Sequence, residues 1–257
     1  MATLRLTFLG SGTSMGVPTL GCPCRVCHSD DPCDRRTRPS VLLQYNGRAI
    51  VIDTSPDFRF QALRAGLERV DAVLYTHSHA DHILGLDDLR PFCLHQRQPI
   101  PLYANRETLT ALRRTFFYVF DDPTPDSTIP EVELKEITGP LELFGQTFQP
   151  VPALHGTMEV LGFRFGPAAY VTDFSQIEAS SRARLAGLDL LVLDALREKP
   201  HPMHSSLSES LALVRELQPC RAYFTHICHD LPHAATNARL PAGVELAYDT
   251  LAVELEV

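Results

Sequence analysis

One short segment, residues 77–82 with the sequence His-Ser-His-Ala-Asp-His, constrains the fold of this chain more than any other. It supplies three imidazoles and one carboxylate directly after the apolar run Ala72 to Tyr75, which is typical of a buried strand. Imidazole and carboxylate groups bind zinc, manganese or iron, and ligands on a loop at a strand end can serve two ions. The segment therefore predicts a metal centre at the end of a strand.

Three more residues with metal-binding side chains occur later in the chain. They are His155, Asp173 and His226, and each follows an apolar run. Any one of them alone is typical of a turn at the end of a strand. Together with the first segment, they complete the ligand series of a dinuclear hydrolase.

These residues make the sequence resemble the metallo-β-lactamase superfamily, whose pattern is H-x-H-x-D-H followed by separate His, Asp and His ligands. The resemblance implies two divalent ions, zinc or manganese, that share Asp173 as a bridging ligand. It also implies that Asp53, which closes the run Ala49 to Ile52, supports the metal loops without binding a metal. The implied terminal ligands are His77, His79 and His155 for one ion, and Asp81, His82 and His226 for the other.

The length and composition of the chain indicate its number of domains, its location and its possible partners. With 257 residues the chain can bury a large core, and we predict a single domain over residues 1–257. The N-terminus has neither a basic segment nor a long apolar one, so we expect no signal peptide, no membrane span and a cytoplasmic location. A net charge of −8 argues against a polynucleotide partner, although bound divalent cations can attract a small anion. A homodimer is left open.

The cysteines indicate a second metal site. Seven cysteines in a reducing compartment, an odd number, do not suggest a disulfide framework. Cys22, Cys24 and Cys27 lie within six residues in a loop, close enough to bind one tetrahedral zinc, which needs a fourth ligand. From the residues alone, the candidates for that fourth position are His28, Cys33, Cys228 and His229.

Three features together narrow the resemblance: the opening segment Gly10 to Pro18, the three-cysteine segment, and the segment Thr225 to His229. They look like the phosphoribosyl 1,2-cyclic phosphodiesterase family of phosphonate catabolism. In that family the fourth structural ligand lies three residues after the final catalytic His. The resemblance therefore implies that His229 completes a structural zinc site.

The pattern of turns and apolar residues predicts a mixed α/β (α+β) protein. Asn46-Gly47 between apolar runs predicts a hairpin, and further hairpins are expected at Phe144-Gly145-Gln146 and Gly166-Pro167, so that His155 and Asp173 end successive antiparallel strands. The proline-rich residues 121–130 are expected to form a surface excursion. The four-layer αββα sandwich is implied by the resemblance. Helices are predicted over residues 58–67, 84–92, 107–118, 176–185 and 207–217, the last with Ser205-Ser206 as caps.

The chemistry that such a site can perform is the hydrolysis of a phosphodiester. Two metals roughly 3.5–4 Å apart can lower the pKa of a water between them and polarise the phosphoryl oxygen. The departing alkoxide then needs a proton from a general acid. His204 matches the family's His proposed for that role, and His201 is the competing choice. We assign His204 and Asp81 as catalytic, Asp81 being also a metal ligand.

Two other functions are compatible with parts of the sequence pattern. A tRNA 3′-processing ribonuclease would need an RNA-grasping arm, which the acidic composition and the absence of a long basic insertion disfavour. A role resembling pyrroloquinoline quinone biosynthesis protein B fits the opening pattern and the cysteines, but the complete ligand set weakens it. β-Lactamases and thioesterases lack the cysteine segment. The preferred prediction is a metal-dependent phosphodiesterase acting on a small cyclic phosphodiester, such as phosphoribosyl 1,2-cyclic phosphate.

Overall fold

The computed structural model describes residues 3–121 and 128–256, which form two seven-stranded sheets. The first sheet has the order β14-β1-β2-β3-β4-β5-β6, antiparallel from β14 to β3 and parallel from β3 to β6. Its strands are β1 (Thr3–Gly10), β2 (Ser40–Tyr45), β3 (Arg48–Ile52), β4 (Ala72–Leu74), β5 (Ile100–Ala104), β6 (Val132–Glu136) and β14 (Ala252–Glu256).

The second sheet has the same plan, with the order β13-β12-β11-β10-β9-β8-β7. Strands β13 to β10 run parallel and β10 to β7 antiparallel. Its strands are β7 (Leu141–Leu143), β8 (Gln146–His155), β9 (Met158–Phe165), β10 (Ala168–Val171), β11 (Leu190–Asp194), β12 (Arg221–Thr225) and β13 (Val244–Leu246).

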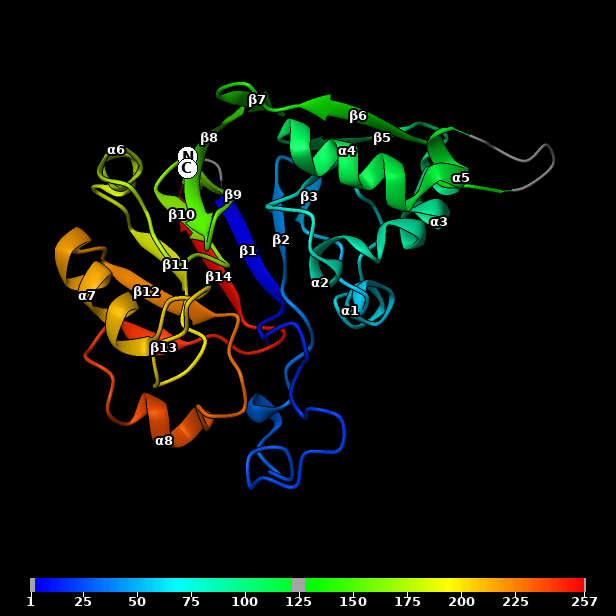
Figure 1. Cartoon of the computed structure of the whole chain (residues 1–257). Helices are drawn as coiled ribbons and strands as arrows, with labels where there is room; N and C mark the ends of the chain where they lie inside the picture. The colour runs from blue at the N-terminus through cyan, green and yellow to red at the C-terminus, as the bar shows by residue number, and fades with distance from the viewer. Residues whose placement is uncertain (1–2, 122–127, 257) are drawn as a thin grey trace.

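The sheets pack face to face, and helices cover the outer face of each (Figure 1). Side chains alternate along a strand, so neighbouring residues enter different cores. In β3, Ile50 and Ile52 pack between the sheets, whereas Val51 packs against the helices. In β11, Val192 packs between the sheets and Leu191 against the other helical layer. This is the four-layer αββα arrangement implied by the resemblance.

Helices divide between the two outer layers (Figure 1). The first sheet is covered by α1 (Phe58–Arg64), α2 (Ala80–Ile83), η2 (Leu86–Leu89), α3 (Arg90–Gln96), α4 (Arg106–Thr115) and α5 (Phe117–Phe120). On the other side lie α6 (Ala179–Arg182), η3 (Ala183–Leu185), α7 (Leu207–Leu217) and α8 (His233–Asn237), while η1 (Pro32–Asp34) belongs to the N-terminal loop. Among the described residues, no helix is both long enough and apolar enough to cross a membrane.

The local predictions have mixed outcomes. The helix over 207–217 is confirmed, with Ser206 and Glu209 forming a capping box. The prediction for 84–92 is wrong at both ends, because helix η2 begins at Leu86 after Gly85 packs against the Ser55 carbonyl, and α3 continues to Gln96. The other three predicted helices form with different bounds. The helix predicted over 58–67 ends at Arg64, and the one predicted over 107–118 is divided at Phe116 into α4 and α5. The one predicted over 176–185 begins at Ala179 and consists of α6 and η3.

All three expected hairpins form, but one inference drawn from them is wrong. His155 and Asp173 do not end successive strands, because β9 lies between β8 and β10 in both sequence and sheet. The short turn at Gly156 returns the chain as β9 before it reaches β10. Residues 122–127 of the expected surface excursion lie outside the described residues.

The N-terminal loop, residues 11–39, extends below the two sheets in Figure 1. Its first part is tied to the loop after β12. Ser11 accepts a backbone hydrogen bond from Ile227 (3.0 Å), and Thr13 donates one to the Ile227 carbonyl (3.1 Å). The Asp249 carboxylate accepts from both the backbone and the hydroxyl of Ser11. The cysteine segment in this loop is thereby held beside the end of β12.

Candidate metal centre

The metal-binding side chains gather where strands of both sheets end. His77 lies just beyond β4, His155 ends β8, Asp173 follows β10, and His226 follows β12. Asp173 and His226 adopt left-handed backbone conformations, with φ of 54° and 57°. Such conformations are uncommon outside glycine and often occur at functional sites. They turn each side chain off its strand and into the group.

The structure brings all seven predicted ligands together in two groups that share Asp173. One group contains His77, His79, His155 and Asp173, and the other contains Asp81, His82, Asp173 and His226. Asp173 Oδ2 lies 3.6 Å from His77 Nε2 and 3.3 Å from His82 Nε2, and Asp173 Oδ1 lies 2.9 Å from His226 Nε2. This carboxylate therefore stands between the two groups, where a bridging ligand must be.

Unpartnered buried atoms test whether metals fit these groups. Among the described residues, Nε2 of His77, His82 and His226 and Oδ2 of Asp81 are buried without a hydrogen-bond partner. Leaving one buried polar atom unsatisfied costs about 1–3 kcal/mol, and these atoms divide between the two groups, one in the first and three in the second, so each group needs a partner. Divalent cations supply that partner, since imidazole and carboxylate groups are their ligands. The residues fit a dinuclear site.

Other groups hold the ligands in orientation. The His82 Nδ1–H donates to Asp53 Oδ2 (2.7 Å), and the backbone N–H and hydroxyl of Thr76 donate to the same carboxylate (2.8 Å each). The His155 Nδ1–H donates to the carbonyl oxygen of Met203 (2.7 Å). In both imidazoles this leaves Nε2 free to face the centre, as in known metal sites where a second residue selects the tautomer. Asp53 occupies the supporting position that the resemblance implies for it.

The electrostatics keep the central carboxylates ionised. Burial alone would raise the pKa of Asp173, but the charges on His226 and His82 hold that pKa well below its usual range. Burial would likewise lower the pKa of His226, but the Asp173 carboxylate raises it to about 10. Burial lowers the pKa of His155 to about 4. Because an imidazole binds a metal only in its neutral form, a cation that binds beside these carboxylates must displace the proton that the raised pKa of His226 holds there.

His204 contacts a ligand of the centre directly, whereas His201 contacts His204. The ring of His204 stacks on that of His226, with centroids 4.9 Å apart, whereas His201 contacts His204 at 5.1 Å. The His204 Nδ1–H donates to Asp194 Oδ2 (3.2 Å). Burial, followed by the charge on His226, lowers the pKa of His204 to about 4. Of the two candidate acids, only His204 has both a carboxylate partner and contact with the ligands.

The sequence-based prediction missed Asp194. It is fully buried at the end of β11, where burial raises its pKa well above the usual range, and its second oxygen lies 3.9 Å from His226 Nδ1. It therefore touches both His204 and a predicted metal ligand. The signal that could have found it is the one that found Asp53 and Asp173: an acidic residue closing the apolar run Leu190 to Leu193.

The cysteine segment and His229 form a separate group. Cys22, Cys24, Cys27 and His229 place one ligand atom each within 4.8 Å of one another. The distances from His229 Nδ1 to the sulfurs of Cys22 and Cys27 are 3.3 and 3.4 Å. Tetrahedral zinc with ordinary bond lengths separates a sulfur and a nitrogen ligand by about 3.5 Å, so the group fits one zinc ion. Of the four candidates for the fourth ligand, the structure brings His229 to this position.

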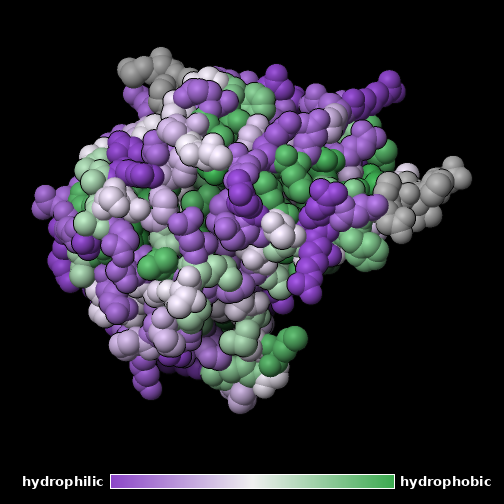
Figure 2. Space-filling view, turned by 45° about the horizontal axis from the view of Figure 1, so that its top comes forward, coloured by the Kyte–Doolittle hydropathy of each residue, from purple (hydrophilic) through white to green (hydrophobic). Residues whose placement is uncertain are grey.

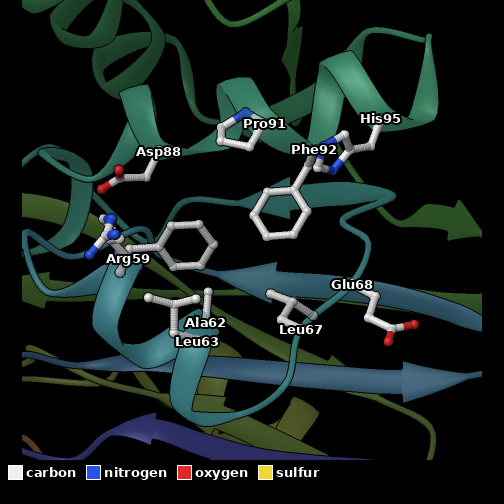
Figure 3. Close-up of a pocket in the computed structure, with 10 residues that line it drawn as sticks. Arg59, Ala62, Leu63, Leu67, Glu68, Asp88, Pro91, Phe92 and His95 are labelled. Carbon is white, nitrogen blue, oxygen red and sulfur yellow. The ribbon is translucent and has the colours of Figure 1, made fainter.

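A cavity of about 490 Å³, separate from the candidate metal centre, lies on the outer helical face, between α1 and α3 (Figure 3). Phe92 and Pro91 face Ala62 and Leu63 across it, with charged side chains at its edges. Its lining includes none of the predicted site residues. On the face shown in Figure 2, apolar residues also gather on the side of the outer helices, among mostly hydrophilic surroundings.

Comparison with known proteins agrees with this geometry. The beta-lactamase superfamily domain matches residues 48–227, which contain all seven ligands of the candidate centre. A solved structure described as a new diphosphatase from the PhnP family is 53% identical, with a TM-score of 0.94, and the match covers 99% of this chain and 98% of that one.

Two other matches are more distant or only partial. An octanoyltransferase from Porphyromonas gingivalis is 39% identical over 254 residues, which are 96% of this chain. The chain spans about half, 51%, of the length of that relative. The zinc-bound PqqB of Methylobacterium extorquens is 24% identical with a TM-score of 0.76, covering 98% of this chain and 100% of that one, and shares the fold.

Proposed function

Because the chain belongs to the beta-lactamase superfamily and, within it, to the PhnP family, we propose that it is a metal-dependent phosphodiesterase of small cyclic phosphodiesters. The preferred class is a five-membered cyclic phosphate on a sugar, such as phosphoribosyl 1,2-cyclic phosphate. The observation that carries the proposal is the position of Asp173 between the two ligand groups, which together contain four buried ligand atoms without a hydrogen-bond partner among the described residues. Two divalent ions, if bound there, would supply a nucleophile from water at neutral pH and would polarise the phosphoryl oxygen.

The residues of the chain have separate tasks in this reaction. Asp173 joins the two ligand groups, and Asp53 fixes the tautomer of His82 so that Nε2 faces the centre. His204 gives a proton from Nε2 to the departing alkoxide, while Asp194 holds the opposite ring nitrogen. An anionic phosphodiester beside Nε2 favours the protonated imidazole, which opposes the effect of burial on its pKa.

The first experiment is a substrate panel with the metal-reconstituted enzyme. We expect hydrolysis of bis(p-nitrophenyl) phosphate and of a sugar 1,2-cyclic phosphate, with nucleic acid a poor substrate because the net charge is −8. Turnover of nitrocefin or of a glutathione thioester without turnover of any phosphodiester would reject the proposal. Efficient cleavage of precursor tRNA would favour the ribonuclease alternative, and no hydrolysis at all would favour a role like that of PqqB.

The second experiment tests His204 through the leaving group. His204→Ala should lose about 10²–10⁴-fold in rate on a sugar cyclic phosphate, whose alkoxide is strongly basic. The loss should be much smaller on a p-nitrophenyl ester, because that phenolate leaves without a proton. His95→Ala, at an exposed histidine on the outer helical face, is the matched control. Equal losses on both substrates would make His204 a binding residue and return His201 as the candidate acid.

A further inference from the structure

A cavity of about 270 Å³ opens beside His204. Its lining includes none of the seven ligands of the metal centre and consists of residues 13–15, Leu196, Arg197, His201, His204 and residues 228–230. Backbone hydrogen bonds join these walls: Cys228 donates to the Leu196 carbonyl (3.0 Å), and Thr13 donates to that of Ile227 (3.1 Å). Because the walls are tied together by the backbone, the cavity is preformed.

The place of His204 indicates which part of a substrate this cavity would receive. His204 borders both the metal centre, where its ring stacks on His226, and the cavity. A general acid stands beside the oxygen that leaves. Whatever is attached to that oxygen must therefore extend past His204, away from the metal ligands and into the cavity.

We propose that this cavity is a subsite for the leaving portion of the substrate, and that it takes an uncharged, hydroxyl-bearing sugar ring. The proposal rests on the proposed function, since it uses His204 as the acid. It assigns a binding role to Asp230, Arg197 and His201, which the catalytic step does not use.

The polar groups around the cavity include both hydrogen-bond donors and an acceptor, as a sugar hydroxyl requires. Arg197 is held by Nε and Nη2, which donate to the carbonyls of Lys199 and Pro200. In the described part of the chain its Nη1 has no partner, so it can donate to a ligand. His201 Nδ1 accepts the Met203 N–H (3.2 Å), which puts the ring proton on Nε2 as a second donor. The exposed Asp230 carboxylate is an acceptor.

The charge and the size of the cavity limit the class of ligand that it can bind. One guanidinium and one carboxylate offset each other, so the lining does not select an anion, and a second phosphate would face Asp230. Met15, which is 57% exposed, and Leu196 add apolar surface for the face of a ring. A volume of about 270 Å³ lies just below the range of about 300–1,000 Å³ typical of larger ligands, so a monosaccharide fits. A phosphate carried by the sugar would extend into solvent.

Three five-membered cyclic phosphates test the subsite: ethylene phosphate, ribose 1,2-cyclic phosphate and its 5-phosphate. They share the reacting ring and differ in hydroxyls and charge. Asp230→Asn should lower kcat/KM about tenfold for ribose 1,2-cyclic phosphate, the size of effect expected from a hydrogen bond to a charged group. The loss on ethylene phosphate, which has no hydroxyl, should be clearly smaller. Glu198→Gln is the matched control, because Glu198 pairs with Arg239 and is not part of the lining.

Two results would overturn the subsite. Equal losses on ethylene phosphate and ribose 1,2-cyclic phosphate would mean that Asp230 does not contact hydroxyls. A gain by Asp230→Asn on the 5-phosphate would mean that the cavity takes an anion. If the unaltered enzyme hydrolyses none of the three compounds nor bis(p-nitrophenyl) phosphate, the proposed function itself fails, and the subsite with it.

A second variant guards against an indirect effect through zinc, because Asp230 Oδ1 lies 3.8 Å from His229 Nε2. His201→Asn keeps a side-chain acceptor for the Met203 N–H and removes the Nε2 donor. It should lose several-fold in kcat/KM on ribose 1,2-cyclic phosphate, with zinc content unchanged and less loss on ethylene phosphate. If neither variant separates the two substrates while zinc is retained, the proposal is wrong.

Discussion

The two candidate metal sites of this chain differ in how they are held. At the candidate centre, four of the seven ligands are 0–1% exposed, three of them just beyond strands of the two sheets and His82 in α2. In the cysteine group all four ligands are only partly buried, and the three cysteines lie in a loop that contains no helix or strand at those positions. Both groups nevertheless take a ligand from the same loop, His226 and His229.

The difference predicts different consequences of metal loss. The centre is supported by the fold, since Asp53 and Thr76 hold His82 through hydrogen bonds that involve no ion. Its ligands should keep their places when the metals leave, so the loss is one of chemistry. The cysteine segment has few other restraints, and in such sites the free energy of metal binding is folding free energy. Its loss should therefore appear in stability before catalysis.

The largest effect is expected from Asp173→Asn. It removes the carboxylate that joins the two ligand groups, and loss of several kcal/mol of metal-derived stabilisation corresponds to at least about 10³-fold in kcat. Metal analysis should show the catalytic pair lost and the zinc of the cysteine group retained. The exposed Asp189→Asn is the control. Full activity in Asp173→Asn would contradict the assignment of the bridge.

A smaller loss is expected from Asp194→Asn. The substitution keeps the shape of the side chain but removes the carboxylate that accepts from His204 and faces His226. Residues that orient ligands are typically worth about 10–100-fold in activity or metal affinity. If Asp194 acts mainly through His204, the loss in kcat should be larger for basic leaving groups than for p-nitrophenolate. If metal is lost and the loss in kcat does not depend on the leaving group, Asp194 acts through the metal ligand His226 instead.

For Cys24→Ser we expect a loss of stability with little direct loss of chemistry. Zinc content should fall by about one ion per chain, and each kcal/mol lost lowers Tm by about 2–4 °C at this size. Cys220→Ser, at an exposed cysteine outside the group, should change neither quantity. If Cys24→Ser keeps both its Tm and its zinc, the group is misassigned.

The smallest effect is expected from a substitution of Asp71, a buried carboxylate that directly precedes β4 of the first sheet and belongs to neither metal group. It accepts from the Ala49 N–H and from Arg48 and Arg69. Burial alone would raise the pKa of Asp71, but these donors lower it below the usual value. Its contribution is therefore present above the unfolded pKa, near 4, and lost as the pH falls through the folded value.

Asp71→Asn should lower the free energy of unfolding at neutral pH by about 1.5–3 kcal/mol, the usual worth of hydrogen bonds to a charged group. Denaturant melts over a range of pH should show the difference shrinking in acid, and a chelator should not change it. A difference that depends on metal would mean that the two kinds of site are not independent.

Local sequence was enough for the elements that depend on neighbouring residues. The helix of α7 follows from Ser206 and Glu209, and the β2–β3 hairpin from Asn46-Gly47, because caps and tight turns are set by hydrogen bonds and backbone angles within a few residues. The ligand types were also visible, since a metal needs imidazole and carboxylate groups whatever the fold. The four-layer architecture came from the resemblance to a family.

By itself, the sequence determined which residues can bind metal and that they follow strands. Only the tertiary structure decided which of them meet: it placed His229, and not Cys33, beside the three cysteines, it placed His204, and not His201, against Asp194 and His226, and it revealed Asp194. It also imposed left-handed backbone on Asp173 and His226, against their local preference. The physical reason is that these positions depend on contacts between strands distant in the chain, whose packing outweighs the about 1–3 kcal/mol that such a conformation costs.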